Sequence, residues 1–148
     1  MKSIQKIQEE IAEEFEEYDD WMDKYNYLIE LSRDLPLIDP KQKVKENLIH
    51  GCQSKVWLNA EFRDGMMYFT ADSDAIITKG IIALLIRVLS GQPAASVMHS
   101  DLWFIDRIGL RQNLSPTRSN GLLSMIKQMK LYALAYHTRE QQKSGMIS

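Results

Sequence analysis

The feature that most constrains the fold is a β-hairpin pattern in the middle of the chain. Apolar residues occupy every second position from Val56 to Phe62, which is the two-residue period of a half-buried strand. Arg63-Asp64-Gly65 then predicts a tight turn, because Gly65 readily adopts a positive φ. Residues 66–71 return as a second strand, and residues 44–49 read as a weaker extended segment before the first. The sequence therefore predicts a small antiparallel meander of three strands.

Helical patterns precede this meander. Apolar residues recur at steps of three and four from Ile4 to Tyr18, with acidic residues between them, which is typical of an amphipathic helix. Asp19 or Asp20 is suited to cap a second helix that carries Trp21. Two prolines in the segment 34–43 predict a loop after that helix.

Helical patterns also follow the meander. Asp72-Ser73-Asp74 precedes an apolar segment, 75–89, and we expect Asp74 to cap that helix before Ser90-Gly91 ends it. A small helix is expected at 101–108, and a turn-rich junction at 114–121 begins a last helix. Residues 139–148 are polar and are expected to be frayed. The order of helices, antiparallel sheet and helices indicates an α+β fold in one domain that spans residues 1–148.

Composition narrows the classes of function. The chain has 148 residues, 45% hydrophobic and 26% charged, which is sufficient for one core without disulfide or metal staples. The net charge of -2 gives no basic footprint for nucleic acid. No apolar run reaches the roughly 20 residues that cross a bilayer. One cysteine and no recognisable signal peptide lead us to expect a cytoplasmic protein.

Cys52 is the only cysteine, so it cannot form an internal disulfide or, by itself, hold a cluster or structural zinc. Single cysteines are usually buried as small core hydrophobes. Here, however, Gly51 precedes the thiol and polar Gln53 and Ser54 follow it, which favours a loop. A core cysteine and a reactive thiol both fit this local pattern. A reactive thiol would need activation, either by His50 or Lys55 nearby or by the active site of a partner protein, and Trp57 could wall a pocket around it.

Three separated motifs resemble one family. Gly51-Cys52-Gln53-Ser54-x-Val56-Trp57 resembles the cysteine motif of SufE-type (SufE/CsdE) sulfur acceptors. Asp72-Ser73-Asp74-Ala75-x-Ile77-x-Lys79-Gly80 is similar to their second signature, and the segment 114–122, which includes Arg118, is similar to the third. The order and spacing of the motifs agree with the family from about Ile4 to Ala135.

The resemblance implies a fold and a role. The fold is a three-stranded antiparallel sheet packed by helices, shared with IscU-type scaffold proteins. In the implied role, Cys52 accepts persulfide sulfur from a cysteine desulfurase of the SufS/CsdA type, stimulates that enzyme, and passes the sulfur to a cluster scaffold or another acceptor. The protein is then a sulfur carrier rather than a stand-alone enzyme. It is expected to hold no metal and no cofactor, and pyridoxal phosphate belongs to the desulfurase only.

The expected site centres on Cys52. His50, Gly51, Gln53 and Ser54 form its loop, and we expect Asp74 and Arg118 to share the face that contacts the partner. Arg118 at the start of a helix is unfavourable for the helix dipole, which suggests a specific contact, although simple exposure accounts for it equally.

Three other classes of protein remain open. A cysteine-dependent hydrolase would need a histidine and an oxyanion donor beside Cys52. A cluster or zinc scaffold conflicts with the presence of a single cysteine. A plain interaction module would not need the thiol.

Overall fold

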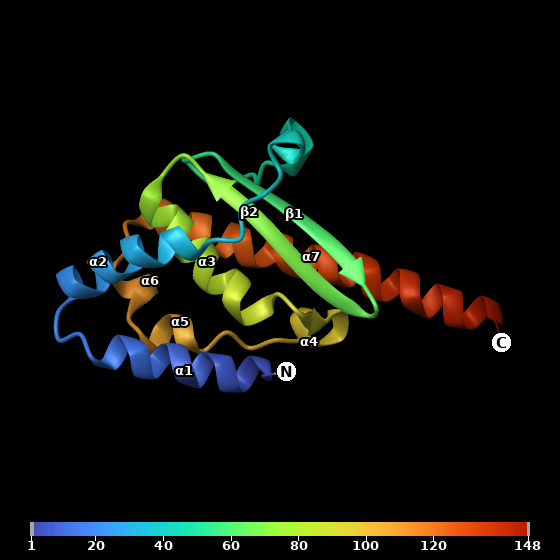
Figure 1. Cartoon of the computed structure of the whole chain (residues 1–148), viewed down its shortest axis with the longest axis horizontal. Helices are drawn as coiled ribbons and strands as arrows, with labels where there is room; N and C mark the ends of the chain where they lie inside the picture. Colours follow the sequence, from blue (N-terminus) through green and yellow to red (C-terminus); the bar gives the residue numbers. More distant parts are fainter. Residues whose placement is uncertain (1, 148) are drawn as a thin grey trace.

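A twisted β-hairpin lies across a set of helices in the computed structural model, which describes residues 2–147. Figure 1 shows the hairpin crossing the long last helix, whose C-terminal end extends away from the second helix. Short 3-10 turns connect the second helix to the hairpin: η1 (Ser32–Asp34), η2 (Pro40–Gln42) and η3 (Lys45–Asn47). The helices and strands are α1 (Ile4–Glu16), α2 (Trp21–Leu31), β1 (Val56–Arg63), β2 (Met66–Ser73), α3 (Ile76–Leu89), β3 (Gln92–Pro93), α4 (Ala94–Met98), α5 (Phe104–Arg107), α6 (Leu110–Asn113) and α7 (Pro116–Ile147).

The sheet is antiparallel with the order β1-β2-β3. β1 and β2 pair along their whole length, from Val56 opposite Ser73 to Arg63 opposite Met66. Asp64 and Gly65 form the turn with φ values of 53° and 80°, as a tight two-residue hairpin requires. The predicted α+β class with three antiparallel strands is therefore confirmed.

The prediction that residues 44–49 form the third strand was wrong. Residues 44–49 form η3 and a single bridge from Leu48 to Trp57, whereas the third strand is Gln92–Pro93, which pairs with Met66 and Met67. Two residues are too short for an alternating pattern to develop. Pro93 also lacks the N–H of an ordinary strand residue, so nothing local marks this segment as a strand.

Helix α3 forms the centre of the core. It contacts α1, α2, α7 and β2, and most of its side chains are buried. A helix that is apolar on nearly all sides is stable only when other elements surround it, as they do here. Gly80 lets α2 approach closely, because a Cβ atom at this position would clash with the backbone carbonyl of Leu28.

An ion pair ties α1 to α3. Both guanidinium nitrogens of Arg87 donate to the Glu14 carboxylate, which also accepts a hydrogen bond from the Tyr27 hydroxyl of α2. These donors hold the pKa of Glu14 below its usual value, with the hydrogen bond from Arg87 as the largest cause. Glu14 therefore keeps Arg87 occupied at neutral pH.

The helix boundaries bear on three further predictions. Asp20 caps α2 by accepting from the Asp23 N–H, as one of the two predicted alternatives. The Asp74 cap on α3 was wrong, because Ala75 is the N-cap residue, α3 has no side-chain cap, and the Asp74 carboxylate accepts from the Lys55 N–H. α7 is helical through Ile147, while Ser148 lies outside the described residues, so fraying of the end from about residue 139 stays a prediction. None of the helices within residues 2–147 is both long and apolar enough to cross a bilayer.

The close contact at Gly80 gives a stability prediction. Gly80→Ala should lower the free energy of unfolding by about 1–3 kcal/mol, because the new methyl group must push α2 and α3 apart. Gly121→Ala in α7 is the matched control, since its Cβ would meet the nearest atom at an ordinary 3.5 Å. The control should be neutral or more stable by up to about 1 kcal/mol. Urea unfolding measures both, and equal effects at the two positions would contradict this packing.

Candidate functional site

The Cys52 loop leaves the sheet at the start of β1. Its base is closed by a hydrogen bond from the Ile49 N–H to the Val56 carbonyl, 2.9 Å long. Gly51 has a φ of 92°, which few residues other than glycine adopt. A Cβ atom at Gly51 would lie 2.5 Å from Ser124 Oγ of α7. The loop thus depends on glycine both for its backbone conformation and for its contact with α7.

The Cys52 side chain is half-buried between this loop and α7. Its Sγ donates to the Gly121 carbonyl oxygen across 3.6 Å. Beside it lies a small cavity of about 210 Å³, whose lining includes Thr78 and Ile81 of α3 and Met125 of α7. The prediction of a thiol on a loop is correct: Gly51 and Gln53 are exposed on either side of Cys52, whose own side chain turns inward and is half-buried.

Burial affects the acidity of this thiol. Removal from water disfavours the charged thiolate, so burial raises the pKa of Cys52 above its ordinary value. An ordinary cysteine is already mostly protonated at neutral pH, with a pKa of about 8.5. Cys52 is therefore a protonated, weakly nucleophilic thiol in this conformation, and attack requires a change in its surroundings.

The far end of the loop is tied to the start of α3. The Lys55 N–H donates to Asp74 Oδ1 at 3.1 Å, and the Asp74 N–H donates to the Lys55 carbonyl at 3.3 Å. Ser73 Oγ donates to the same carbonyl at 2.8 Å. Asp74 is thus a tether of the Cys52 loop rather than a helix cap, and its side chain position affects how freely that loop moves.

The third motif lies beside the thiol. Arg118 lines the same cavity as Cys52, together with Gln53 and Ser54 of the loop. Its backbone N–H donates to Ser115 Oγ at 3.3 Å, and its guanidinium donates to the Tyr25 hydroxyl at 3.5 Å. Arg118 remains exposed, so the structure gives it both a weak specific contact and access to solvent. Among the described residues that line the cavity, Arg118 is the one with a charged side chain.

Two residues that were expected beside the Cys52 thiol, His50 and Trp57, do not line its cavity. His50 is exposed on the loop and does not line the cavity. Trp57 also lies outside the cavity lining, so the suggestion that it walls the pocket was wrong: the Lys43 ammonium sits 4.5 Å from the centre of its ring. Strand alternation places Trp57 on the opposite face of β1 from Val56, away from the core.

Sequence reasoning missed several residues around the thiol. Thr78 and Ile81 come from α3, and Gly121, Ser124 and Met125 come from α7. Thr78, Gly121 and Met125 fall within or beside the quoted motifs, which was the available signal. Their approach to Cys52 depends on how α3 and α7 pack, and no local pattern encodes that distance. Within residues 2–147 no three His, Cys, Asp or Glu side chains gather as metal ligands, and the expected absence of a metal stays a prediction.

Known proteins resemble this chain in sequence over most of its length. A sequence model of the SufE family, described as an Fe-S metabolism associated domain, matches residues 9–133. An uncharacterized SufE-like protein of Rhizobium etli is 39% identical over 127 residues, which cover 82% of this chain and 86% of that protein. A second uncharacterized SufE-like protein, from Rhizobium meliloti, is 36% identical over 82% of this chain and 91% of that protein.

A plant relative and a solved structure extend the comparison. The SufE-like protein 1, chloroplastic/mitochondrial, of Arabidopsis thaliana is 36% identical over 93% of this chain, which spans only 37% of that protein. The solution structure of a hypothetical protein from Thermus thermophilus superposes with a TM-score of 0.74 at 20% identity, and covers 89% of this chain and 96% of that one. That structure supports the fold alone.

The fold and the site define an α+β protein with a small antiparallel sheet and a single cysteine, which lies on a glycine-containing loop packed against α7. The chain belongs to the SufE family, whose domain is associated with Fe–S metabolism. The resemblance seen in the three motifs is therefore confirmed.

The buried thiol gives a prediction for chemical reactivity. Because burial raises the pKa of Cys52, the pH at which its alkylation by iodoacetamide reaches half its maximal rate should be higher in the folded chain than in urea. Cys52 is the only thiol, so intact mass reports its alkylation directly. A half-maximal pH at or below that of the unfolded chain would show that the thiol is not desolvated at rest.

Proposed function

We propose that this protein is a sulfur acceptor in which Cys52 takes persulfide sulfur from a cysteine desulfurase. The observation that carries the proposal is the half-buried Cys52 thiol beside its own small cavity in a chain of the SufE family. A thiol used only for packing would not need a glycine-dependent loop or an adjoining space.

The transfer is a thiol exchange at sulfur. The Cys52 thiolate attacks the terminal sulfur of a persulfide on the partner's cysteine. The new S–S bond forms on Cys52, the partner's S–S bond breaks, and the partner's cysteine leaves as a thiolate. The proton lost from Cys52 balances the charge when it is taken up by that leaving thiolate. No external oxidant or reductant is required.

The loop supports two positions for the thiol. With Cys52 folded inward, burial raises the pKa of its thiol and so favours the protonated form over the nucleophilic thiolate. Release from the Gly121 carbonyl and from the Asp74 tether would bring the thiol to the surface, where it can ionise and reach another protein. After transfer, the inward position provides a cavity of about 210 Å³ for the terminal sulfur, bordered by Ile81, Met125 and the cationic Arg118.

A cysteine-dependent hydrolase is less well supported. Such an enzyme needs a histidine within hydrogen-bond reach of the thiol, but the described residues that line the Cys52 cavity include no histidine. A non-catalytic interaction module allows a buried cysteine, but it gives no role to the cavity beside Cys52. The sulfur-acceptor reading accounts for both the thiol and the space beside it.

The partners in this proposal are those that membership of the SufE family implies. The sulfur donor is a cysteine desulfurase, whose pyridoxal phosphate stays in that enzyme, and the sulfur passes to a cluster scaffold or another acceptor for Fe–S cluster assembly. In this proposal the protein has no resident metal or cofactor, stimulates the desulfurase by removing its persulfide, and works in the cytoplasm.

Sulfur loading on Cys52 is the direct prediction. Incubation with a cysteine desulfurase and L-cysteine should increase the intact mass by one or more sulfur atoms. The gain should vanish with a thiol reductant and should be absent in Cys52→Ser. Sulfur uptake that persists in Cys52→Ser would contradict the proposal, provided that the variant unfolds at the same urea concentration as the parent protein.

The partner-contacting face is tested separately. Arg118→Glu should weaken desulfurase binding by about fivefold or more, because the cation lies beside the thiol that must reach the partner. Lys143→Glu, the same reversal in the exposed last part of α7, is the matched control.

Asp74→Lys removes the loop tether and should change desulfurase stimulation more than Glu140→Lys does. Titration calorimetry and sulfide release measure these effects, and equal results for site and control variants would place the face elsewhere.

A further inference from the structure

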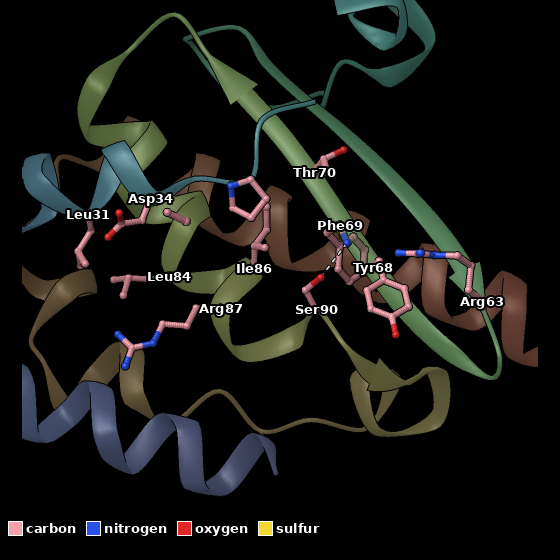
Figure 2. Close-up of a pocket in the computed structure, with 12 residues that line it drawn as sticks. Leu31, Asp34, Arg63, Tyr68, Phe69, Thr70, Leu84, Ile86, Arg87 and Ser90 are labelled. Carbon is pink, nitrogen blue, oxygen red and sulfur yellow. Dashed lines mark hydrogen bonds between the residues drawn. The ribbon is translucent and has the colours of Figure 1, made fainter. Parts of the chain in front are cut away.

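A second and larger cavity lies toward the C-terminal end of α3. Its volume is about 640 Å³, and Figure 2 shows it between β2, α3 and the end of α2. It shares no lining residue with the Cys52 cavity, which borders Thr78 and Ile81 near the other end of α3. Its size is within the range of about 300–1,000 Å³ that is typical of small-molecule sites.

The cavity exists because the free edge of β2 is only partly covered. At Met67 the edge carbonyl accepts from the Gly91 N–H, and at Ala71 the edge bonds to Pro36 and Ile38. Between these points Ser90 Oγ accepts from the Phe69 N–H at 3.0 Å, where a neighbouring strand would otherwise lie (Figure 2). A strand added to this edge would collide with the segments already bonded at Met67 and at Ala71. The space between them therefore suits a compact molecule rather than an extended peptide.

The apolar part of the lining is formed in advance. Leu31, Pro36 and Tyr68 are apolar lining residues that keep accessible surface in the cavity. Phe69 and Leu84 are each 1% exposed and belong to the packed core that supports this surface. Rigid apolar surface of this kind binds an apolar body without paying for reordering of the protein.

The charged residues at the rim select the polar group of the ligand. Arg87 is occupied by Glu14, which accepts from both of its terminal nitrogens. Arg63 lies over the Tyr68 ring at 4.2 Å, and Figure 2 shows its guanidinium reaching toward the cavity. Its carboxylate neighbour Glu61 is 3.7 Å away, and both side chains are more than 60% exposed, so water weakens that pair.

The two ends of the cavity therefore differ. Arg63 provides a cation at one end, and Figure 2 shows Asp34 at the other, where its carboxylate disfavours an anion. We propose that this cavity binds a small organic acid, with its apolar body on Leu31 and Pro36 and its acid group at Arg63 and Tyr68. This site is separate from sulfur transfer at Cys52 and does not depend on it.

The test uses two dyes that differ in charge. 8-Anilinonaphthalene-1-sulfonate is an apolar aromatic acid, and N-phenyl-1-naphthylamine has a similar apolar body without the acid. The sulfonate should bind the folded, full-length protein at one site and should bind more tightly than the neutral dye. Arg63→Gln should weaken sulfonate binding by about fivefold or more and leave binding of the neutral dye unchanged.

The matched control is Arg139→Gln. Arg139 also stacks on a tyrosine, 5.6 Å from the Tyr136 ring centre, but it lines neither cavity. This variant should bind both dyes as the parent protein does. In an amide NMR titration, the sulfonate should shift the signals of Thr70, Leu84 and Ser90 more than those of Cys52 and Gly121.

Four results would overturn the proposal: no saturable binding of the sulfonate, an equal loss of both dyes in Arg63→Gln, an equal loss of sulfonate binding in Arg139→Gln, or amide shifts centred on Cys52.

Discussion

The packing of the Cys52 side chain against the backbone of α7 at Gly121 is the contact on which the site depends. It joins residues that are 69 positions apart in the sequence, and it sets both the burial of the thiol and the position of the adjoining cavity. The tether between Lys55 and Asp74 closes the other end of the same loop. A thiol held in this way is protected at rest, and few hydrogen bonds must break to expose it. That combination suits a carrier, which must keep a reactive sulfur and later release it.

Helix α3 makes this arrangement possible. The segment just before it holds the Cys52 loop through Ser73 and Asp74, its first turns line the small cavity, and its last turns form the floor of the larger one. Gly80 brings it against α2, and Arg87 connects it to α1 through Glu14. One buried helix therefore supports two separate cavities, and the larger one arises where β2 lacks a neighbouring strand.

Local patterns predicted most of the fold but only part of the site. Period-two alternation identified the hairpin, and periodic apolar residues identified α1 and α3, because these signals act within a few residues. Gln92–Pro93 escaped because two residues have no period, and residues 44–49 paired with β1 through only one bridge. Cys52 and its loop could be predicted from the sequence, whereas the roles of Thr78, Gly121 and Asp74 could not. Those roles depend on distances between elements, such as the bond from Lys55 to Asp74 that replaced the expected helix cap.

The central claim of the proposed function is that the inward position of Cys52 shelters a sulfur atom bound to it. The most direct measurement is the rate at which dithiothreitol removes sulfur from persulfide-loaded protein, followed by intact mass in the folded chain and in urea. The account predicts removal at least about tenfold slower from the folded chain, since attack must wait for the loop to open. Equal rates in the two states would show that the sulfur is exposed to solvent and that the cavity beside Cys52 does not protect it.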